Sequence, residues 1–226
     1  MRVNILISVT FAQNIDMDNL EQKVYSKEVI EFTAVANEYC AFIESAEKYD
    51  GLQILRFMQK LLPLLYSKVL LLPVFESLIE EEQEKFVREE DWQLIKDTII
   101  VKLGEANDYL ELYDDSIEFS QETVPASISE KLADIYQDLK DYLIAYSIGT
   151  VELMNEALWN CQESFNLFWG QKLLSSLKAI HSALRFPDKI GQAEKQANGS
   201  VDDIDTSDWI ISQRQEEMRK DRDGEI

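Results

Sequence analysis

The chain has 226 residues, and its 43 acidic and 22 basic side chains give a net charge of −21. This length is enough for one folded domain with a tail, and the 46% apolar content supplies a core. The carboxylate excess argues against unaided binding to nucleic acid or anionic lipid, because either polyanion would be repelled. Seven Gly and four Pro leave little turn chemistry for a many-stranded sheet, so the composition favours helices.

The first 23 residues are predicted to be an extension ahead of the folded domain. The apolar stretch from Val3 to Ala12 is short for a signal peptide, which needs about 15 or more residues and a small-x-small cleavage site. Met17 opens a polar lead into the first helical pattern. We therefore interpret residues 1–16 as an upstream extension from a misassigned start, or as a loosely attached segment.

Helical periodicity dominates residues 24–186, the predicted domain. A first helix is expected from an N-cap at Ser26 to Asp50–Gly51. A second is expected over residues 52–72, kinked or split near Pro63 because proline removes a backbone donor. Three basic residues interrupt the apolar run of this second helix, which predicts a buried helix rather than a membrane span.

The middle of the chain is the most acidic part. Residues 76–122 carry 16 acids and 4 bases, more than half of the total excess. The run from Glu76 to Asp91 is either a solvated helix end with a loop or a surface for a basic partner. Under the second interpretation the partner contacts are Glu80, Glu81 and Glu82. Further helices are expected over residues 90–103, ending in a turn at Gly104, and over residues 107–119.

The last two helices have the clearest pattern. Ser127 or Ser129 can cap a helix that runs through Tyr146, and a second helix of 35 residues runs from Val151 to Arg185. The short turn between them makes the two helices antiparallel neighbours. The sequence thus predicts an all-α fold, a bundle of about six helices with a long antiparallel C-terminal pair.

Residues 187–226 are predicted to form an acidic, largely flexible tail, with a short helical segment near residues 207–220. Its apolar feature is Trp209, Ile210 and Ile211. These side chains either fold onto a partner as a linear segment or dock on the chain's own domain, since exposure would leave a sticky patch.

Most catalytic arrangements lack their parts. With one histidine, His181, a His-ligated metal site or a Ser-His-Asp relay cannot be assembled in the usual way. No glycine-rich phosphate loop is present. Cys40 and Cys161 stand in no metal or redox spacing, so we interpret them as buried reduced thiols of a cytoplasmic protein.

One array of carboxylates remains on the last two helices. Asp134, Asp138 and Asp141 share one helix face by their spacing, and Glu156 and Glu163 share a face of the neighbouring helix. If the faces meet, a site for Mg²⁺ or Mn²⁺ results, as in all-α nucleotide pyrophosphatases. The predicted ligands are Asp134, Asp138, Glu156 and Glu163. Two solvated helix faces would give the same pattern, and the paired Glu-x-x-Glu and Glu-x-x-Asp motifs of those enzymes are missing.

Aromatic and amide side chains cluster on the long final helix. They could line a ligand pocket or form a core whose polar tips need hydrogen-bond partners. The predicted pocket residues are Trp159, Asn160, Asn166, Trp169 and Gln171. Gly170 lies mid-helix at a cost of about 1 kcal/mol relative to Ala, which indicates close approach by another helix or a ligand.

Four segments resemble a known family. They are EFTAVANEYCAFIE (Glu31–Glu44), QKLLPLLYSK (Gln59–Lys68), LADIYQDLKD (Leu132–Asp141) and MNEALWNCQESFNLFWGQKL (Met154–Leu173). Together they resemble the bacterial domain-of-unknown-function family numbered 5063, over about residues 24–185. The resemblance implies an all-α soluble domain with no activity or catalytic residue to carry over.

We therefore expect a cytoplasmic interaction or accessory protein without catalytic activity or cofactor. Its expected partner is a protein with a basic surface, not nucleic acid or a membrane, and the oligomeric state stays open. The alternative is a divalent-metal-dependent hydrolase that resembles all-α nucleotide pyrophosphatases and uses Mg²⁺ or Mn²⁺.

Overall fold

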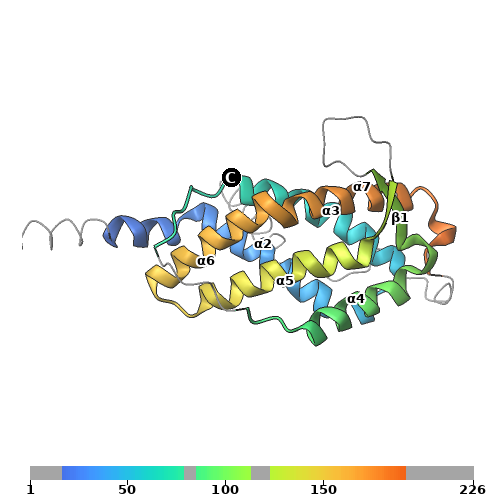
Figure 1. Ribbon diagram of the computed structural model, residues 1–226, viewed down its shortest axis with the longest axis horizontal. Coiled ribbons are helices and arrows are strands. Elements are labelled where there is room, and N and C mark those ends of the chain that lie inside the picture. The colour runs from blue at the N-terminus through green and yellow to red at the C-terminus, as the bar shows by residue number, and fades with distance from the viewer. Residues whose placement is uncertain (1–16, 79–84, 113–122, 192–226) are drawn as a thin grey trace, which may run out of the picture.

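The described part of the chain forms a short first helix, six further α-helices and one small hairpin (Figure 1). The computed structural model describes residues 17–78, 85–112 and 123–191, and the structural statements below refer to these. A helix at residues 17–24 precedes α2 (Lys27–Glu44), α3 (Gly51–Leu70), α4 (Glu89–Leu103), β1 (Asp108–Leu112), β2 (Thr123–Ser127), α5 (Ile128–Ser147), α6 (Val151–Ser164) and α7 (Gly170–Ala183). Short turns of 3₁₀-helix occur at η1 (Ala46–Lys48), η2 (Gly104–Ala106) and η4 (Pro187–Lys189), and η3 (Phe165–Trp169) is a π-helical turn. The predicted all-α class is confirmed.

Helix α5 lies at the centre of the bundle and packs against α2, α4, α6 and α7 (Figure 1). It begins at the predicted cap, Ser127, whose hydroxyl accepts the Glu130 N–H at 3.2 Å. Its inward side chains Leu132, Ile135 and Leu139 are fully buried. Polar tips in this core are satisfied as well, since the Tyr39 hydroxyl donates to the Leu132 carbonyl at 2.8 Å.

The second helix, α3, is not split by its proline. Asp50 and Gln53 form a reciprocal capping box at its start, because the backbone N–H of each donates to the side-chain oxygen of the other. The helix continues through Pro63, which faces solvent, so water can satisfy the carbonyl that loses its intrahelical donor.

The helix predicted over residues 107–119 is wrong for residues 108–112, and the rest of it lies outside the described residues. Residues 108–112 form β1, which pairs antiparallel with β2, with Leu110 opposite Pro125. Asn107 fixes this departure, because its carbonyl accepts the Ile128 N–H at 2.9 Å and its amide oxygen accepts the Ser129 N–H at 3.0 Å. These two bonds bind the start of the hairpin to the start of α5.

The long C-terminal helix is confirmed and contains an unpredicted π turn. α6, η3 and α7 follow one another without a break from Val151 to Ala183. The N–H of Gly170 reaches back to the Phe165 carbonyl. A Cβ on Gly170 would lie 2.5 Å from that oxygen. The close neighbour of Gly170 is therefore its own helix, not another helix or a ligand.

The packed region extends beyond Phe186. Ile190 is buried, and the Gly191 N–H donates to the Leu103 carbonyl at 3.2 Å. Ile190 also closes over Gly51, where an added Cβ would lie 2.8 Å from Ile190 Cγ2. Within the described part of the chain no helix is long and apolar enough to cross a membrane.

Candidate functional site

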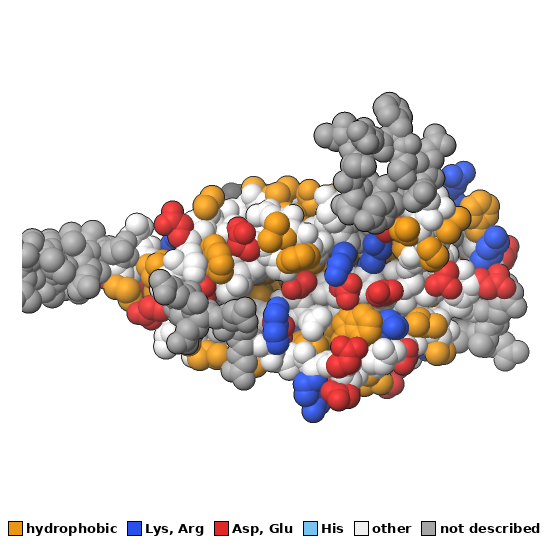
Figure 2. Space-filling model, viewed as in Figure 1, with side chains coloured by type: hydrophobic (Ala, Val, Ile, Leu, Met, Phe, Trp, Pro, Cys, Tyr) orange, Lys and Arg blue, Asp and Glu red, His pale blue; other side chains and the backbone are white. Residues whose placement is uncertain are grey.

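The carboxylates of α5 share one face, as their spacing predicts, and each has a partner inside the protein. Asp134 accepts the indole N–H of Trp92 at 2.9 Å from α4 and the Lys172 ammonium at 2.7 Å from α7. It thereby links three helices. Figure 2 shows acidic and basic side chains alternating over this face of the bundle.

One turn further along α5, Asp138 accepts the Ser164 hydroxyl at 2.7 Å. Burial raises the pKa of the Asp138 carboxyl above its ordinary value. The Ser164 hydrogen bond and the nearby Lys85 and Lys172 cations act in the opposite direction without cancelling the effect of burial, and Asp141 adds to the rise.

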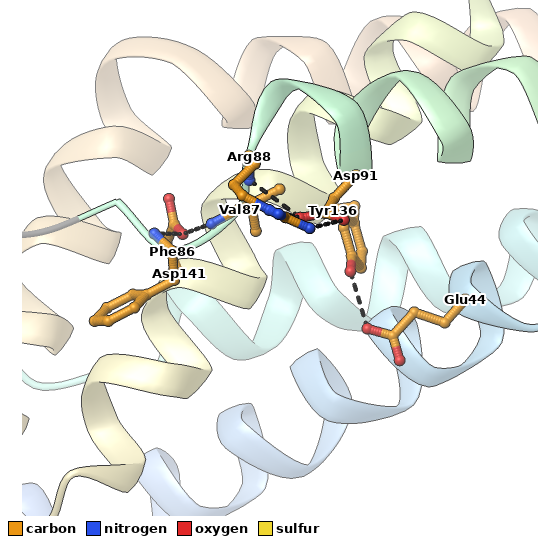
Figure 3. A network of polar contacts seen from close by, with 7 residues as sticks. All are labelled: Glu44, Phe86, Val87, Arg88, Asp91, Tyr136 and Asp141. Atoms are coloured by element: carbon orange, nitrogen blue, oxygen red, sulfur yellow. Dashed lines mark hydrogen bonds and ion pairs between the residues drawn. The ribbon is translucent and has the colours of Figure 1, made fainter.

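Asp141 is buried beneath the connection between α3 and α4 (Figure 3). Its Oδ1 accepts the Phe86 N–H at 2.8 Å and the Val87 N–H at 2.9 Å. Its Oδ2 is buried without a hydrogen-bond donor among the described residues and faces Lys85 Nζ at 3.5 Å as an ion pair. One carboxylate of α5 thus holds the chain just before α4 begins.

Two further polar contacts lie close to Asp141 (Figure 3). The Arg88 guanidinium donates to Asp91 at 3.1 Å across the first turn of α4. Tyr136 of α5 donates to Glu44 of α2 at 2.9 Å, and burial together with this carboxylate raises the pKa of the Tyr136 phenol.

Glu156 of α6 binds the start of the connection between α3 and α4, as Asp141 binds its end. Its carboxylate accepts the Ser77 hydroxyl at 2.9 Å and the Leu78 N–H at 3.0 Å. Asn155 donates to the Glu76 carbonyl at 2.8 Å, and Gln162 exchanges hydrogen bonds with the backbone of residues 73 and 75. We call residues 73–78 and 85–88 the strap flanks, since both are bound to the α5–α6 pair.

The predicted metal ligands are not brought together. The carboxylates of Asp134, Asp138 and Glu156 accept hydrogen bonds from protein donors, and Glu163 is exposed. No group of three or more His, Cys, Asp or Glu side chains in the described ranges could hold a metal ion. The two helix faces lie side by side, but the strap flanks and Lys172 engage the carboxylates that were predicted to bind a cation.

The five residues predicted to line a pocket have different surroundings in the structure. Trp169 is fully buried and donates its indole N–H to the Cys161 carbonyl at 3.2 Å, as in the core interpretation. Trp159 and Asn160 are half-buried, and Asn160 donates to the Glu156 carbonyl. Asn166 and Gln171 face solvent.

The remaining candidates have ordinary surroundings. Both cysteines are free and buried, and burial raises the pKa of each thiol, which keeps it protonated. His181 is exposed, with its Nδ1 3.3 Å from the Gln59 amide nitrogen. The predicted partner contacts Glu80, Glu81, Glu82, Trp209, Ile210 and Ile211 lie outside the described residues.

Sequence reasoning missed the donors that engage these acids. Ser77, Phe86 and Val87 come from the connection before α4, and Trp92 and Lys172 come from other helices. It also missed a cavity of about 370 Å³ beside the hairpin, because the hairpin was expected to be a helix.

The comparisons with known proteins assign a family. Residues 23–185 match the family described as Domain of unknown function (DUF5063). The chain belongs to this family. The crystal structure of protein BF1032 from Bacteroides fragilis is 40% identical, with a TM-score of 0.63 over 71% of this chain and 94% of that one. A search of the curated proteins gave no match.

Proposed function

We propose that this member of the DUF5063 family is a non-catalytic interaction or accessory domain that binds a basic protein through residues 76–91. The observation that carries the proposal is the attachment of both strap flanks to α5 and α6 by Glu156 and Asp141. The acidic run between them is tied to the domain at both ends.

The charges of this segment support a basic partner. Residues 76–91 contain eight acids, Glu76, Glu80, Glu81, Glu82, Glu84, Glu89, Glu90 and Asp91, and two bases, Lys85 and Arg88, so their net charge is −6. Lys85 faces Asp141 and Arg88 pairs with Asp91. Neither base is therefore available to offset the glutamates, and the potential over the segment attracts cations.

Attachment at both ends also favours binding energetically. Backbone that is already held at both flanks loses less conformational entropy when a partner binds. The same negative charge would repel nucleic acid and anionic lipid, so the proposed partner is a protein of the cytoplasm.

The experiment compares charge removal at two places. The strap variant E80Q/E81Q/E82Q/E84Q removes four negative charges from the strap, residues 79–84 between the two flanks. The control D202N/D203N/D205N/D208N removes four negative charges from the tail. Each protein is immobilised in host lysate, and the captured proteins are quantified by mass spectrometry after elution with increasing salt. We expect basic proteins retained by the wild type and the control to be lost with the strap variant.

Two outcomes would contradict the proposal. One is retention of the same proteins by the strap variant. The other is hydrolysis of nucleoside triphosphates by the wild-type chain with Mg²⁺ or Mn²⁺, which would favour the metal-dependent alternative. Circular dichroism of both variants checks that the fold is intact.

A further inference from the structure

The hairpin lies beside α7 (Figure 1), and a cavity of about 370 Å³ is lined by residues of both. Its walls come from β1, the first residue of α5 and the second half of α7, and residues of η2 and η4 close its ends. This volume falls within the range of about 300–1,000 Å³ that is usual for small-molecule sites. The cavity and Asp141 belong to opposite ends of α5, roughly 20 Å apart by the helical rise.

One part of the cavity wall is apolar and open. Ile128 of α5 and Ala179 and Ala183 of α7 line it, with Phe186 at the end of the helix. The two alanines leave the space that a larger side chain would fill. A flat or short hydrocarbon body would be desolvated there at a gain of about 25 cal/mol per Å² of apolar surface buried.

The other part of the wall is polar. Ser175, Lys178 and Ser182 line the cavity from α7, and Lys189 lines it from η4. The Ser182 hydroxyl donates to the Lys178 carbonyl at 3.0 Å and Ser175 hydrogen-bonds to Glu111, so both hydroxyls are already engaged. The charge of Lys178 acts on the nearby Glu111 carboxylate, and Lys189 lies over the Phe186 ring at 5.9 Å. Neither lysine is held in a direct ion pair within the residues that the structure describes, so both ammonium groups can still attract an anion.

Tyr109 supplies the most specific donor. Its hydroxyl oxygen is inaccessible to solvent and has no hydrogen-bond partner within the described part of the chain. A buried hydroxyl without a partner costs about 1–3 kcal/mol, which an acceptor on a ligand would recover. Burial also raises the pKa of the Tyr109 phenol, so this group keeps its proton and acts as a donor.

The acids beside the cavity have their own partners or lie at its edge. Burial acts to raise the pKa of the Glu111 carboxyl, but hydrogen bonds from Lys131 at 2.7 Å and from Ser175, together with the charges of Lys131 and Lys178, lower it. Asp108 accepts the Asn107 amide at 2.8 Å. Glu105 is exposed. Their charges therefore oppose an anion less than their number suggests.

We propose that this cavity binds a small organic carboxylate. Its carboxylate accepts hydrogen bonds from the Tyr109 hydroxyl and the Lys178 ammonium, and its apolar body lies against Ile128, Ala179 and Ala183. The site is independent of the acidic segment, so its failure would not affect the proposed partner binding.

The test titrates the full-length, ¹⁵N-labelled protein with sodium benzoate and sodium hexanoate, and separately with benzamide and hexanamide. The amides match the acids in shape but carry no charge. We expect saturable shifts of backbone resonances in residues 109–111 and 175–183, with dissociation constants at least about tenfold lower for the carboxylates. Equal affinity of acids and amides, unsaturable shifts, or shifts centred elsewhere would overturn the proposal.

Variants assign the binding to the named groups. Tyr109→Phe removes only the hydroxyl, and Lys178→Gln replaces the ammonium by a shorter neutral amide. Each should weaken carboxylate binding by about fivefold or more, as expected for a lost hydrogen bond of about 1 kcal/mol. The controls Tyr25→Phe and Lys96→Gln, which lie outside the cavity, should bind as the wild type does. Wild-type affinity in both Tyr109→Phe and Lys178→Gln, with spectra that report an intact fold, would overturn the assignment.

Discussion

At the scale of single residues, Asp141 and Glu156 show how a buried carboxylate organises backbone that is distant in sequence. Asp141 accepts the N–H groups of Phe86 and Val87, which precede it by 55 and 54 positions. Glu156 accepts donors of Ser77 and Leu78, which precede it by 79 and 78 positions. Helical spacing predicts which acids share a face, because that depends on local geometry. It does not predict their donors, because those come from a connection without periodicity.

Asp138 leads to a prediction about pH. Burial raises the pKa of its carboxyl in the folded state, so the folded state holds this proton more tightly than the unfolded chain does. The carboxyl therefore lowers stability progressively as the pH rises from about 3.9, its ordinary pKa, through the folded value. Asp138→Asn removes the charge and keeps an acceptor for the Ser164 hydroxyl, so it should stabilise the protein at neutral pH.

Urea denaturation at several pH values tests this expectation. The stability gain of Asp138→Asn should be largest near neutral pH and should vanish below about pH 3, where Asp138 is protonated in both states. Asp97→Asn, at an exposed position of α4, should show no such dependence. A gain that does not change with pH, or a loss at neutral pH, would contradict the attribution to burial.

At the scale of elements, the sequence predicts the strongly periodic helices and fails where side-chain or backbone contacts redirect the chain. α5 begins after Ser127, one of its two predicted caps, and ends one residue beyond the predicted end, because a serine cap and a regular apolar face specify it. The hairpin was missed because Asn107, by bonding to the first turn of α5, turns the chain into a strand. Such a contact between two distant segments leaves no local pattern.

The π turn gives a prediction at this scale. Gly170 follows η3, and a Cβ there would lie 2.5 Å from the Phe165 carbonyl and 3.0 Å from its ring. Gly170→Ala should therefore destabilise the protein by about 1–3 kcal/mol despite the better helix propensity of alanine. Thermal and urea denaturation measure the change. Gln171→Ala, an exposed neighbour, should stay within about 0.5 kcal/mol of wild type, and equal effects of the two would contradict the steric explanation.

At the scale of the whole molecule, the charge of −21 is not spread evenly over the bundle. Ion pairs between elements offset acids on the helices, as Lys68 does for Glu31 and Lys140 for Glu44. The first turn of α4 instead carries three consecutive acids, Glu89, Glu90 and Asp91. Ion pairs therefore balance part of the charge on the bundle helices, and the unbalanced charge continues from the acidic segment into α4.

Closure of the bundle depends on a residue that the sequence assigned to the tail. Ile190 is 5% exposed and lies against Gly51 at the start of α3, while the next residue bonds to the end of α4. Three distant segments thus meet around one isoleucine. Ile190→Ala in the full-length chain should lower the free energy of unfolding by about 2–5 kcal/mol, the usual cost of such a truncation in a core. Urea denaturation should separate it from Ile148→Ala, whose side chain is 55% exposed and should cost less than about 1 kcal/mol. Equal losses in the two variants would contradict the prediction, because they would mean that residues 187–191 contribute no more to the free energy of unfolding than an exposed position does.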